Sequence, residues 1–220
     1  MKRLSILAVC LGVVAVQAAS ARADVPFSFT AHNLPNGGAI PSIGGQTEGI
    51  SVFPLTMDPA HSDILPAPPY PMLAGITSLE LQLTGLTHTN GGDLDIYLID
   101  PFGKTLEIMT DRGNGAAINN ATLIFRDNRP GLPVVGLPPE NGQIVSGSYL
   151  PEDSNVTGGF AKYNGGSGGT DAWILMVIDD SVGDQGGLGS FTLRGTAVPE
   201  PVTLSLLALG ALMFLRRRRA

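Results

Sequence analysis

The 220-residue sequence predicts an all-β fold arranged as a β-sandwich. Glycine occupies 29 positions and proline 17 of the 220. Together they make up about a fifth of the chain, against a usual share of about 12%, so frequent tight turns are expected. Between these turns lie short segments in which apolar and polar residues alternate, which is the pattern of a half-buried strand. Outside the two ends of the chain, no segment has the apolar spacing of a long helix. Since 43% of the residues are apolar, the chain is able to bury a core.

Residues 24–72 form the first part of the central body and have a weak pattern. The candidates for short strands are residues 27–29 and 50–52. Prolines crowd the second half, and residues 66–71 are expected to form a stiff, extended crossover. We therefore expect extended chain and edge strands that wrap on a core formed by residues 73–197.

Clear alternation begins in the next segment. Residues 79–84 alternate strictly between leucine and a polar residue, which predicts a half-buried strand followed by a turn at 87–92. Residues 94–109 predict a hairpin whose turn lies at 101–104, and residues 122–125 predict a fourth strand.

The last third of the body begins with a segment rich in proline and glycine at 128–151, which is expected to be a long surface connection. Residues 173–178 are apolar at every position, which predicts a central strand buried on both faces and anchored by Trp173. An acidic turn at 179–189 then leads to a final strand at 191–193. Short strands separated by glycine-rich turns are typical of a sandwich.

The net charge of −6 hides an asymmetry between the ends and the body of the chain. Seven of the 13 basic residues lie near the two termini, whereas all 19 acidic residues lie between Asp24 and Glu200. The body therefore has six basic residues and a net charge of −13. A nucleic-acid-binding protein needs the opposite sign to neutralise phosphates, so nucleic acid is excluded as a partner.

Residues 1–23 have the three parts of a secretory signal peptide. A short basic start precedes an almost unbroken apolar run at 4–16, and Ala21 and Ala23 fit the small-residue rule for the cleavage site. An N-terminal membrane anchor is the alternative, but the apolar run is short for a membrane span. Cleavage would remove Cys10, the only cysteine, so the exported protein is expected to have no disulfide, thiolate nucleophile or cysteine metal site.

Residues 198–220 contain a proline-rich triplet, a short apolar stretch and a basic end. The triplet and the basic end consist of Pro199, Glu200, Pro201, Arg216, Arg217, Arg218 and Arg219. The apolar stretch at 202–215 would make about 21 Å of helix. Because a bilayer core is about 30 Å thick, this helix is a marginal permanent anchor, and the arginines would stay on the cytoplasmic side.

This combination resembles the PEP-CTERM sorting signal of exopolysaccharide-producing Gram-negative bacteria. The resemblance implies recognition by an exosortase, with transient insertion of the helix into the inner membrane and cleavage near the triplet. It also implies delivery to the cell surface or extracellular matrix, so that the protein is a substrate of the sorting enzyme. A plain tail-anchored helix is the alternative.

A second set of short motifs runs in order from Ile76 to Gly195. In the first half these are His88-Thr89, Gly92-Asp93-Leu94, Pro101-Phe102-Gly103 and Leu106. In the second half they are Tyr149-Leu150-Pro151-Glu152, Phe160, Asn164-Gly165, Trp173-Ile174-Leu175, Val177, Asp179, Gly183-Asp184, Gly186, Leu188 and Phe191-Thr192-Leu193. Their order resembles the P domain (P/Homo B domain), which follows the catalytic domain of proprotein convertases and many bacterial subtilisin-like proteases. The resemblance implies a jelly-roll β-sandwich related to galactose-binding-like domains.

The P domain is an accessory module, which packs on the protease in convertases and stabilises it. The length of this chain leaves no room for a subtilisin-like catalytic domain, and serine proteolysis needs a nucleophile, a base, an orienting carboxylate and an oxyanion hole. His88 is expected to cap backbone groups in its turn. Residues 165–169 match G-x-S-x-G in letters but lack the strand before the serine and the helix after it. We therefore expect that the protein is not an enzyme.

Aspartates in glycine-rich turns supply the hard oxygen ligands that calcium prefers. The candidate ligands of one structural calcium ion are Asp93, Asp179 and Asp184, in a spacing that is not that of an EF-hand. The alternative is that Asp179 and Asp184 form Asx turns at strand ends, with Asp95 on a solvated strand face.

These observations predict a non-catalytic, exported protein of the cell surface or extracellular matrix, with an adhesive or structural role. Its candidate ligands are exopolysaccharide and another surface protein, although an aromatic content of 6% gives little support to a sugar-stacking platform. The alternative is a stand-alone P domain that assists a separate subtilisin-like serine endopeptidase.

Overall fold

The computed structural model describes residues 24–41, 49–55, 62–65, 73–131, 134–155, 158–166 and 173–199. The expected signal peptide with Ala21 and Ala23, the crossover at 66–71, and the expected sorting signal from Glu200 onward lie outside these residues. Within them the chain forms strands and short 3-10 helices, which confirms the all-β prediction. No helix in this described part is long and apolar enough to cross a membrane.

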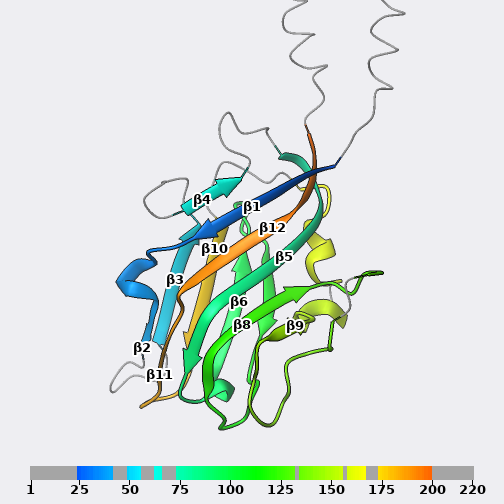
Figure 1. The fold of residues 1–220 in the computed structure, drawn as a ribbon. Helices are drawn as coiled ribbons and strands as arrows, with labels where there is room; N and C mark the ends of the chain where they lie inside the picture. Colours follow the sequence, from blue (N-terminus) through cyan, green and yellow to red (C-terminus); the bar gives the residue numbers. More distant parts are fainter. Residues whose placement is uncertain are drawn as a thin grey trace, which may run out of the picture.

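Two sheets form the two layers of the molecule, and the larger lies in front of the smaller in Figure 1. The larger sheet has the order β2 (Ala39–Pro41), β11 (Gln185–Gly187), β5 (Leu73–His88), β12 (Ser190–Pro199), β1 (Val25–Ala31) and β4 (Ser62–Leu65). On the side of β5 opposite β11 and β12, β5 also pairs with β8 (Ile118–Arg126), which in turn pairs with β9 (Gly147–Tyr149). The smaller sheet has the order β3 (Gly49–Leu55), β10 (Trp173–Asp179), β6 (Leu94–Ile99) and β7 (Thr105–Met109). The 3-10 helices are η1 (Pro35–Gly38), η2 (Gly91–Asp93), η3 (Glu152–Asn155) and η4 (Gly159–Tyr163).

Residues 24–72, which the sequence predicts to supply edge strands, contribute β1 to β4. β2, β3 and β4 do lie at the ends of the strand orders, but β1 is internal because it pairs with both β12 and β4. All strand pairs are antiparallel except β8 with β9. At the other end of the body, β12 runs to Pro199, beyond the expected boundary at residue 197, because it pairs with the start of β5.

β5 is the strand that the leucine alternation predicts, and the leucines at 79–83 are buried. It continues to His88, so the turn expected from residue 87 begins later. The register shifts between Leu83 and Leu86, where Gly85 has a φ of +72°. A left-handed glycine at a bulge lets the strand take up an extra residue, and the shift returns Leu86 to the buried face.

The predicted hairpin at 94–109 is confirmed by β6 and β7. The segment at 128–151 is not only a surface connection, because it contains β9, which lies parallel to β8. Tyr149 supplies the physical reason, since its buried ring lies 6.2 Å from the ring of Phe125 and its hydroxyl donates to the carbonyl of Val145.

β10 lies between β3 and β6, as expected for a central strand. Trp173, at its start, is 3% exposed, and its ring packs edge-on against Tyr163 with 5.1 Å between centroids. Only one face of β10 is buried, however, because Ile174, Met176 and Ile178 are half-buried on the outward face. The prediction that this strand is buried on both faces is therefore wrong.

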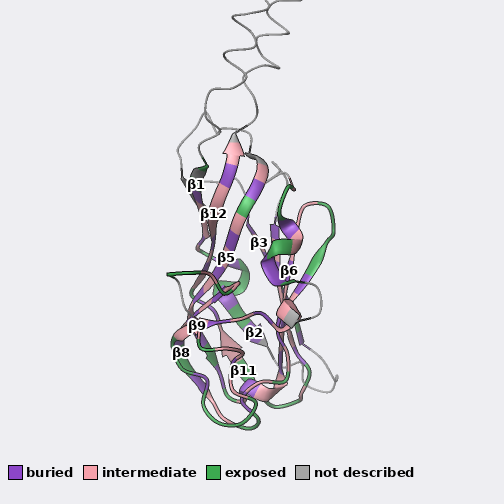
Figure 2. Cartoon of the chain, turned by 90° about the vertical axis from the view of Figure 1, so that its right-hand side faces the viewer, coloured by how far each residue is buried: buried purple, intermediate pink, exposed green. Residues whose placement is uncertain are grey.

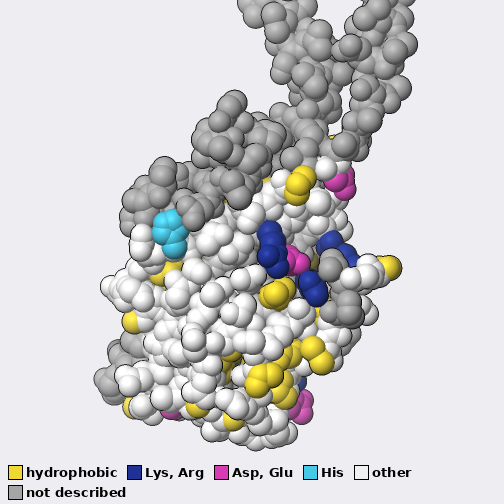
Figure 3. Space-filling model, viewed as in Figure 1, with side chains coloured by type: hydrophobic (Ala, Val, Ile, Leu, Met, Phe, Trp, Pro, Cys, Tyr) yellow, Lys and Arg dark blue, Asp and Glu magenta, His cyan; other side chains and the backbone are white. Residues whose placement is uncertain are grey.

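Buried and partly exposed residues alternate along β5 and β12, as Figure 2 shows with the two layers seen side-on. The outward positions in the middle of these two strands are polar: Ser78, Glu80, Gln82, Thr84, Ser190, Thr192, Arg194 and Thr196. Figure 3 shows this face of the larger sheet, on which apolar side chains are few around the middle of the strands. This face has the composition that is usual for a water-facing antiparallel sheet.

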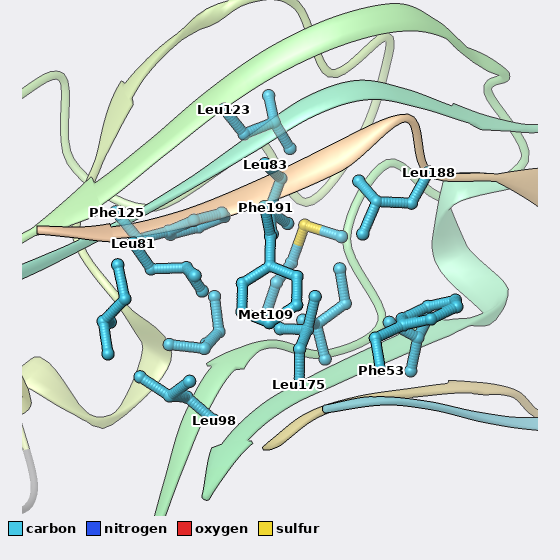
Figure 4. Close-up of a cluster of buried hydrophobic side chains, with 14 of the residues drawn as sticks. Phe53, Leu81, Leu83, Leu98, Met109, Leu123, Phe125, Leu175, Leu188 and Phe191 are labelled. Atoms are coloured by element: carbon cyan, nitrogen blue, oxygen red, sulfur yellow. The ribbon is translucent and has the colours of Figure 1, made fainter. Parts of the chain in front are cut away.

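The hydrophobic core lies between the sheets. In Figure 4, Leu81, Phe125 and Phe191 of the larger sheet point toward Leu98 and Leu175 of the smaller one. All five side chains are fully buried, and each such burial is worth about 2 kcal/mol of transfer free energy. This core holds the two sheets against each other and so fixes the positions of the loops that join their strands.

Candidate functional site

Two connections meet at the end of the sandwich that lies away from the ends of the described chain (Figure 1). One joins β5 to β6 through η2, and the other joins β10 to β11. The strand register pairs Asp179 with Leu94, and the backbone amide of Asp180 donates to the carbonyl of Asp93 at 3.0 Å. We use the name aspartate cluster for the side chains gathered at this end: His88, Asp93, Asp179 and Asp184.

His88 and Asp179 form the buried part of the aspartate cluster. Nε2 of His88 lies 3.3 Å from Oδ2 of Asp179, and both side chains are fully buried. Nδ1 of His88 lies 2.6 Å from the backbone carbonyl oxygen of Asn90, while Oδ1 of Asp179 accepts from the amide of Ser181 at 3.1 Å. A Cβ at Gly186 would lie 2.6 Å from Cδ2 of the imidazole, so only glycine fits beside the ring. His88 thus contacts the backbone of its own turn, as the sequence predicts, and links that turn to the end of β10.

Asp93 and Asp184 form the more exposed part of the cluster, and their carboxyl groups are hydrogen-bonded to each other. Nδ2 of Asn90 donates to Asp93 at 2.7 Å, and Oγ1 of Thr89 donates to Asp184 at 2.5 Å. Burial, followed by the hydrogen bond and charge of Asp184, raises the pKa of Asp93. Hydrogen bonds from Thr89 and Asp93 lower the pKa of Asp184. Asp93 therefore binds a proton more tightly than Asp184 does.

The cluster offers few free oxygens to a calcium ion. Both carboxylate oxygens of Asp179 accept hydrogen bonds within the protein. A cation would be left with Asp93 and Asp184 as carboxylate ligands and would compete with the proton that the raised pKa of Asp93 favours. No group of three or more His, Cys, Asp or Glu within the described residues is arranged to hold a metal ion. Calcium binding stays a prediction, with Asp93 and Asp184 as its carboxylate ligands.

Asp95 lies apart from this cluster, on the outward face of β6. Burial raises its pKa to about 6, and the negative charges of three nearby acids add to the effect. These acids are Asp111, Asp180 and Glu107. Asp95 therefore binds a proton more tightly than an ordinary surface aspartate does.

The outward face of the smaller sheet is apolar beside Asp95. We use the name apolar face for the outward side chains of β3, β10 and β6 other than Asp95: Ile50, Val52, Pro54, Ile174, Met176, Ile178, Tyr97 and Ile99. The register places Met176 between Val52 and Tyr97 in one row across the three strands. Ile50 is 54% exposed and Val52 is 48% exposed. The unbroken apolar run at 173–178 was the signal of this face in the sequence, but it fits a strand buried on both sides equally well.

The remaining catalytic candidates are only partly described. Ser167 of the G-x-S-x-G match and His61 lie outside the described residues. Within the described part of the chain, the side chain of His88 has Asn90 and Asp179 as its hydrogen-bond partners. His88 therefore acts in this structure as a buried link between two turns.

No protein-family model matches this chain, and no curated protein matches it in sequence. Two solved structures are similar at a low level. One is a serine protease of Aeromonas sobria in complex with its chaperone, with 13% identity and a TM-score of 0.38 over 80% of this chain and 27% of that chain. The other is the serine protease of Aeromonas sobria, with 13% identity and a TM-score of 0.37 over 83% of this chain and 29% of that chain. This chain thus spans under a third of the protein it matches, and similarity at this level establishes neither a family nor an activity.

Proposed function

We propose that the protein is a non-catalytic, exported protein of the cell surface or extracellular matrix that acts by adhesion. The observation that carries the proposal is the apolar face, on which Ile50 and Val52 are open to solvent over about half of their surface. Contiguous apolar surface on a soluble domain usually marks contact with another molecule.

The two sheets of the same molecule provide an internal comparison. The outward positions at 78–84 of β5 and 190–196 of β12 are Ser, Thr, Gln, Glu and Arg, whereas those of β3 and β10 are Ile, Val, Pro and Met. Because both faces belong to one protein, we infer that the polar face contacts water and that the apolar face contacts another molecule. The apolar face is the surface through which we expect adhesion to occur.

Export and sorting are parts of the same proposal. The signal-peptide pattern at 1–23 and the PEP-CTERM-like segment at 198–220 support delivery to the surface of a Gram-negative cell, with an exosortase as the sorting partner. The finer fold that we propose is a jelly roll of the P-domain type. Two packed, almost entirely antiparallel sheets and the order of the sequence motifs support it.

A binding experiment with whole cells tests the adhesive role. Purified protein, expressed as the full chain, is added to exosortase-bearing Gram-negative cells, and the bound fraction is measured. We expect the double variant Ile50→Thr, Val52→Thr to bind several-fold less, because it makes the centre of the apolar face polar. The matched double variant Thr84→Ser, Thr192→Ser on the other sheet should bind normally. Equal binding by both variants and the wild type would contradict adhesion through this face.

An assay with protein substrates tests the non-catalytic part of the proposal, for which we expect no cleavage by the purified protein. Cleavage that co-purifies with the chain through every step would refute it. Capture of a subtilisin-like protease by the wild type, and not by the Ile50→Thr, Val52→Thr variant, would instead favour the accessory role.

A further inference from the structure

The six basic residues of the body are unevenly distributed over its surface. Three of them contact residues of η3 or η4: Lys104, Arg112 and Lys162. The other three line one hollow on the outward face of the larger sheet, which we call the arginine hollow: Arg126, Arg129 and Arg194. Figure 3 shows Lys and Arg side chains gathered around an acidic group on this face. In a body with a net charge of −13, this hollow concentrates half of the positive charge.

Strand register builds the hollow. Arg126 of β8 and Arg194 of β12 stand opposite Glu80 of β5, one on each side. Glu80 accepts from Nε of Arg194, and its Oε2 lies 3.6 Å from Nη1 of Arg126. One carboxylate therefore orients two guanidinium groups, and Arg129 adds a third to the same hollow. The Arg194 side chain is 42% exposed, and its bond to Glu80 uses only one of its five N–H donors.

The space beside these arginines is extended and is lined by both polar and apolar side chains. The hollow has a volume of about 280 Å³ and includes Ser28 and Ser78 in its lining. Arg129 also lines an adjoining hollow of about 620 Å³, together with Asn128 and Asn164. That second hollow contains the acid Asp127, whose Oδ1 accepts from the backbone amide of Phe160 at 2.9 Å. Guanidinium groups bind carboxylates through paired hydrogen bonds, and the neighbouring hydroxyl and amide groups suit the hydroxyls of a sugar.

We propose that this hollow binds the carboxylate of an acidic sugar unit within a polysaccharide. Arg129 and Arg194 donate to the carboxylate, and Glu80 is a positioning residue that holds Arg194. The adjoining hollow takes the next units of the chain, which is why a polymer fits the site better than a single ion does. The inference deepens the proposed matrix role by naming a ligand class, and it uses a face of the molecule separate from the apolar face.

Surface plasmon resonance with purified full-length protein on immobilised polygalacturonate tests the proposal. The measurement is made at physiological ionic strength, because salt screens the long-range repulsion between the acidic body and the polymer. We expect the wild type to bind polygalacturonate but not neutral dextran. Arg129→Gln and Arg194→Gln should each weaken binding about ten-fold, because each removes a charge-assisted hydrogen bond. The matched variant Lys104→Gln, which removes one exposed positive charge elsewhere, should bind within about two-fold of the wild type. Thermal unfolding of every variant checks that the fold is kept.

Wild-type affinity in both arginine variants would overturn the assignment, and so would an equal loss in Lys104→Gln. Binding of polyglutamate as tight as that of polygalacturonate would show an acidic-peptide site and would overturn the sugar. Because Ile50 and Val52 lie on the other sheet, the Ile50→Thr, Val52→Thr variant should bind polygalacturonate normally. Failure of this site and failure of the adhesive role are thereby distinguished.

Discussion

Asp95 lies beside the apolar face and within a group of acids, and its pKa of about 6 links the stability of the protein to pH. Because this pKa is raised above its unfolded value of 3.8, the folded state holds the proton more tightly than the unfolded chain does. The resulting stabilisation is fully present below about pH 4 and is lost as the pH rises through about 6. At neutral pH the ionised Asp95 is therefore a cost to the fold.

Asp95→Asn should remove this cost. We expect the free energy of unfolding to rise by about 1 kcal/mol at pH 7.5, a value reduced by the water that still screens this partly exposed group. The gain should disappear below about pH 4, where Asp95 carries a proton in both states. Urea unfolding at a series of pH values measures the difference, and Glu140→Gln, whose side chain is 77% exposed, is the control. A variant that is no more stable than the wild type at pH 7.5 would contradict this account of Asp95.

The raised pKa of Asp93 gives the calcium prediction a specific form. A calcium ion bound by Asp93 and Asp184 should bind better at pH 7.5 than at pH 5, since protons compete with it for the carboxylates. We expect millimolar calcium to raise the thermal midpoint by a few degrees at pH 7.5, with reversal by EDTA and no response in Asp184→Asn. A midpoint that is the same in calcium and in EDTA at both pH values would leave the two aspartates as turn residues.

At the scale of the elements, β5 depends on the bulge at Gly85, whose φ of +72° is unfavourable for any residue with a Cβ. Gly85→Ala should therefore destabilise the protein by about 1 kcal/mol, although a Cβ there would meet no atom closer than 3.5 Å. Gly75→Ala is the matched control in the same strand, because its Cβ would meet nothing within 4 Å and its φ is not left-handed. Chemical unfolding compares the two, and an equal effect would show that the bulge does not need glycine.

The strands that the sequence predicts correctly are those with a local signal. β5, β6 and β7 carry an alternation of apolar and polar residues that can be read within each strand. β11 has the sequence Gln185-Gly186-Gly187, which carries no such signal, and it is a strand because the edges of β2 and β5 pair with it. Short strands of this kind depend on tertiary pairing, which no local pattern reports.

The aspartate cluster was predicted in its residue types and in its turns, but not in the role of each member. Asp179 ends β10 of the smaller sheet and contacts His88, which ends β5 of the larger sheet. The sequence does not show this contact, so Asp179 was predicted as a metal ligand. The arginine hollow was missed for the same reason, because Arg126 and Arg194 meet only through their register with Glu80. Both features depend on which strands become neighbours.

At the scale of the whole molecule, the two sheets present two different outward surfaces. The smaller sheet offers the apolar face, and the larger sheet offers polar side chains and the arginine hollow. In the proposed function, one surface makes an apolar contact at the cell and the other takes an acidic polysaccharide. A protein with two such faces would link a cell to its matrix without any catalytic step.

Hydroxyl-radical footprinting of the protein bound to cells tests the central claim most directly. Met176 lies in the middle of the apolar face, and its oxidation should fall several-fold when the protein moves from free solution to the cell surface. Phe102, which is 70% exposed in a turn of the smaller sheet, should be labelled equally in both states, while buried Met109 should be labelled in neither. Protection of Met176 with unchanged Phe102 is the result that adhesion through the apolar face predicts. Equal oxidation of Met176 in solution and on cells would contradict it.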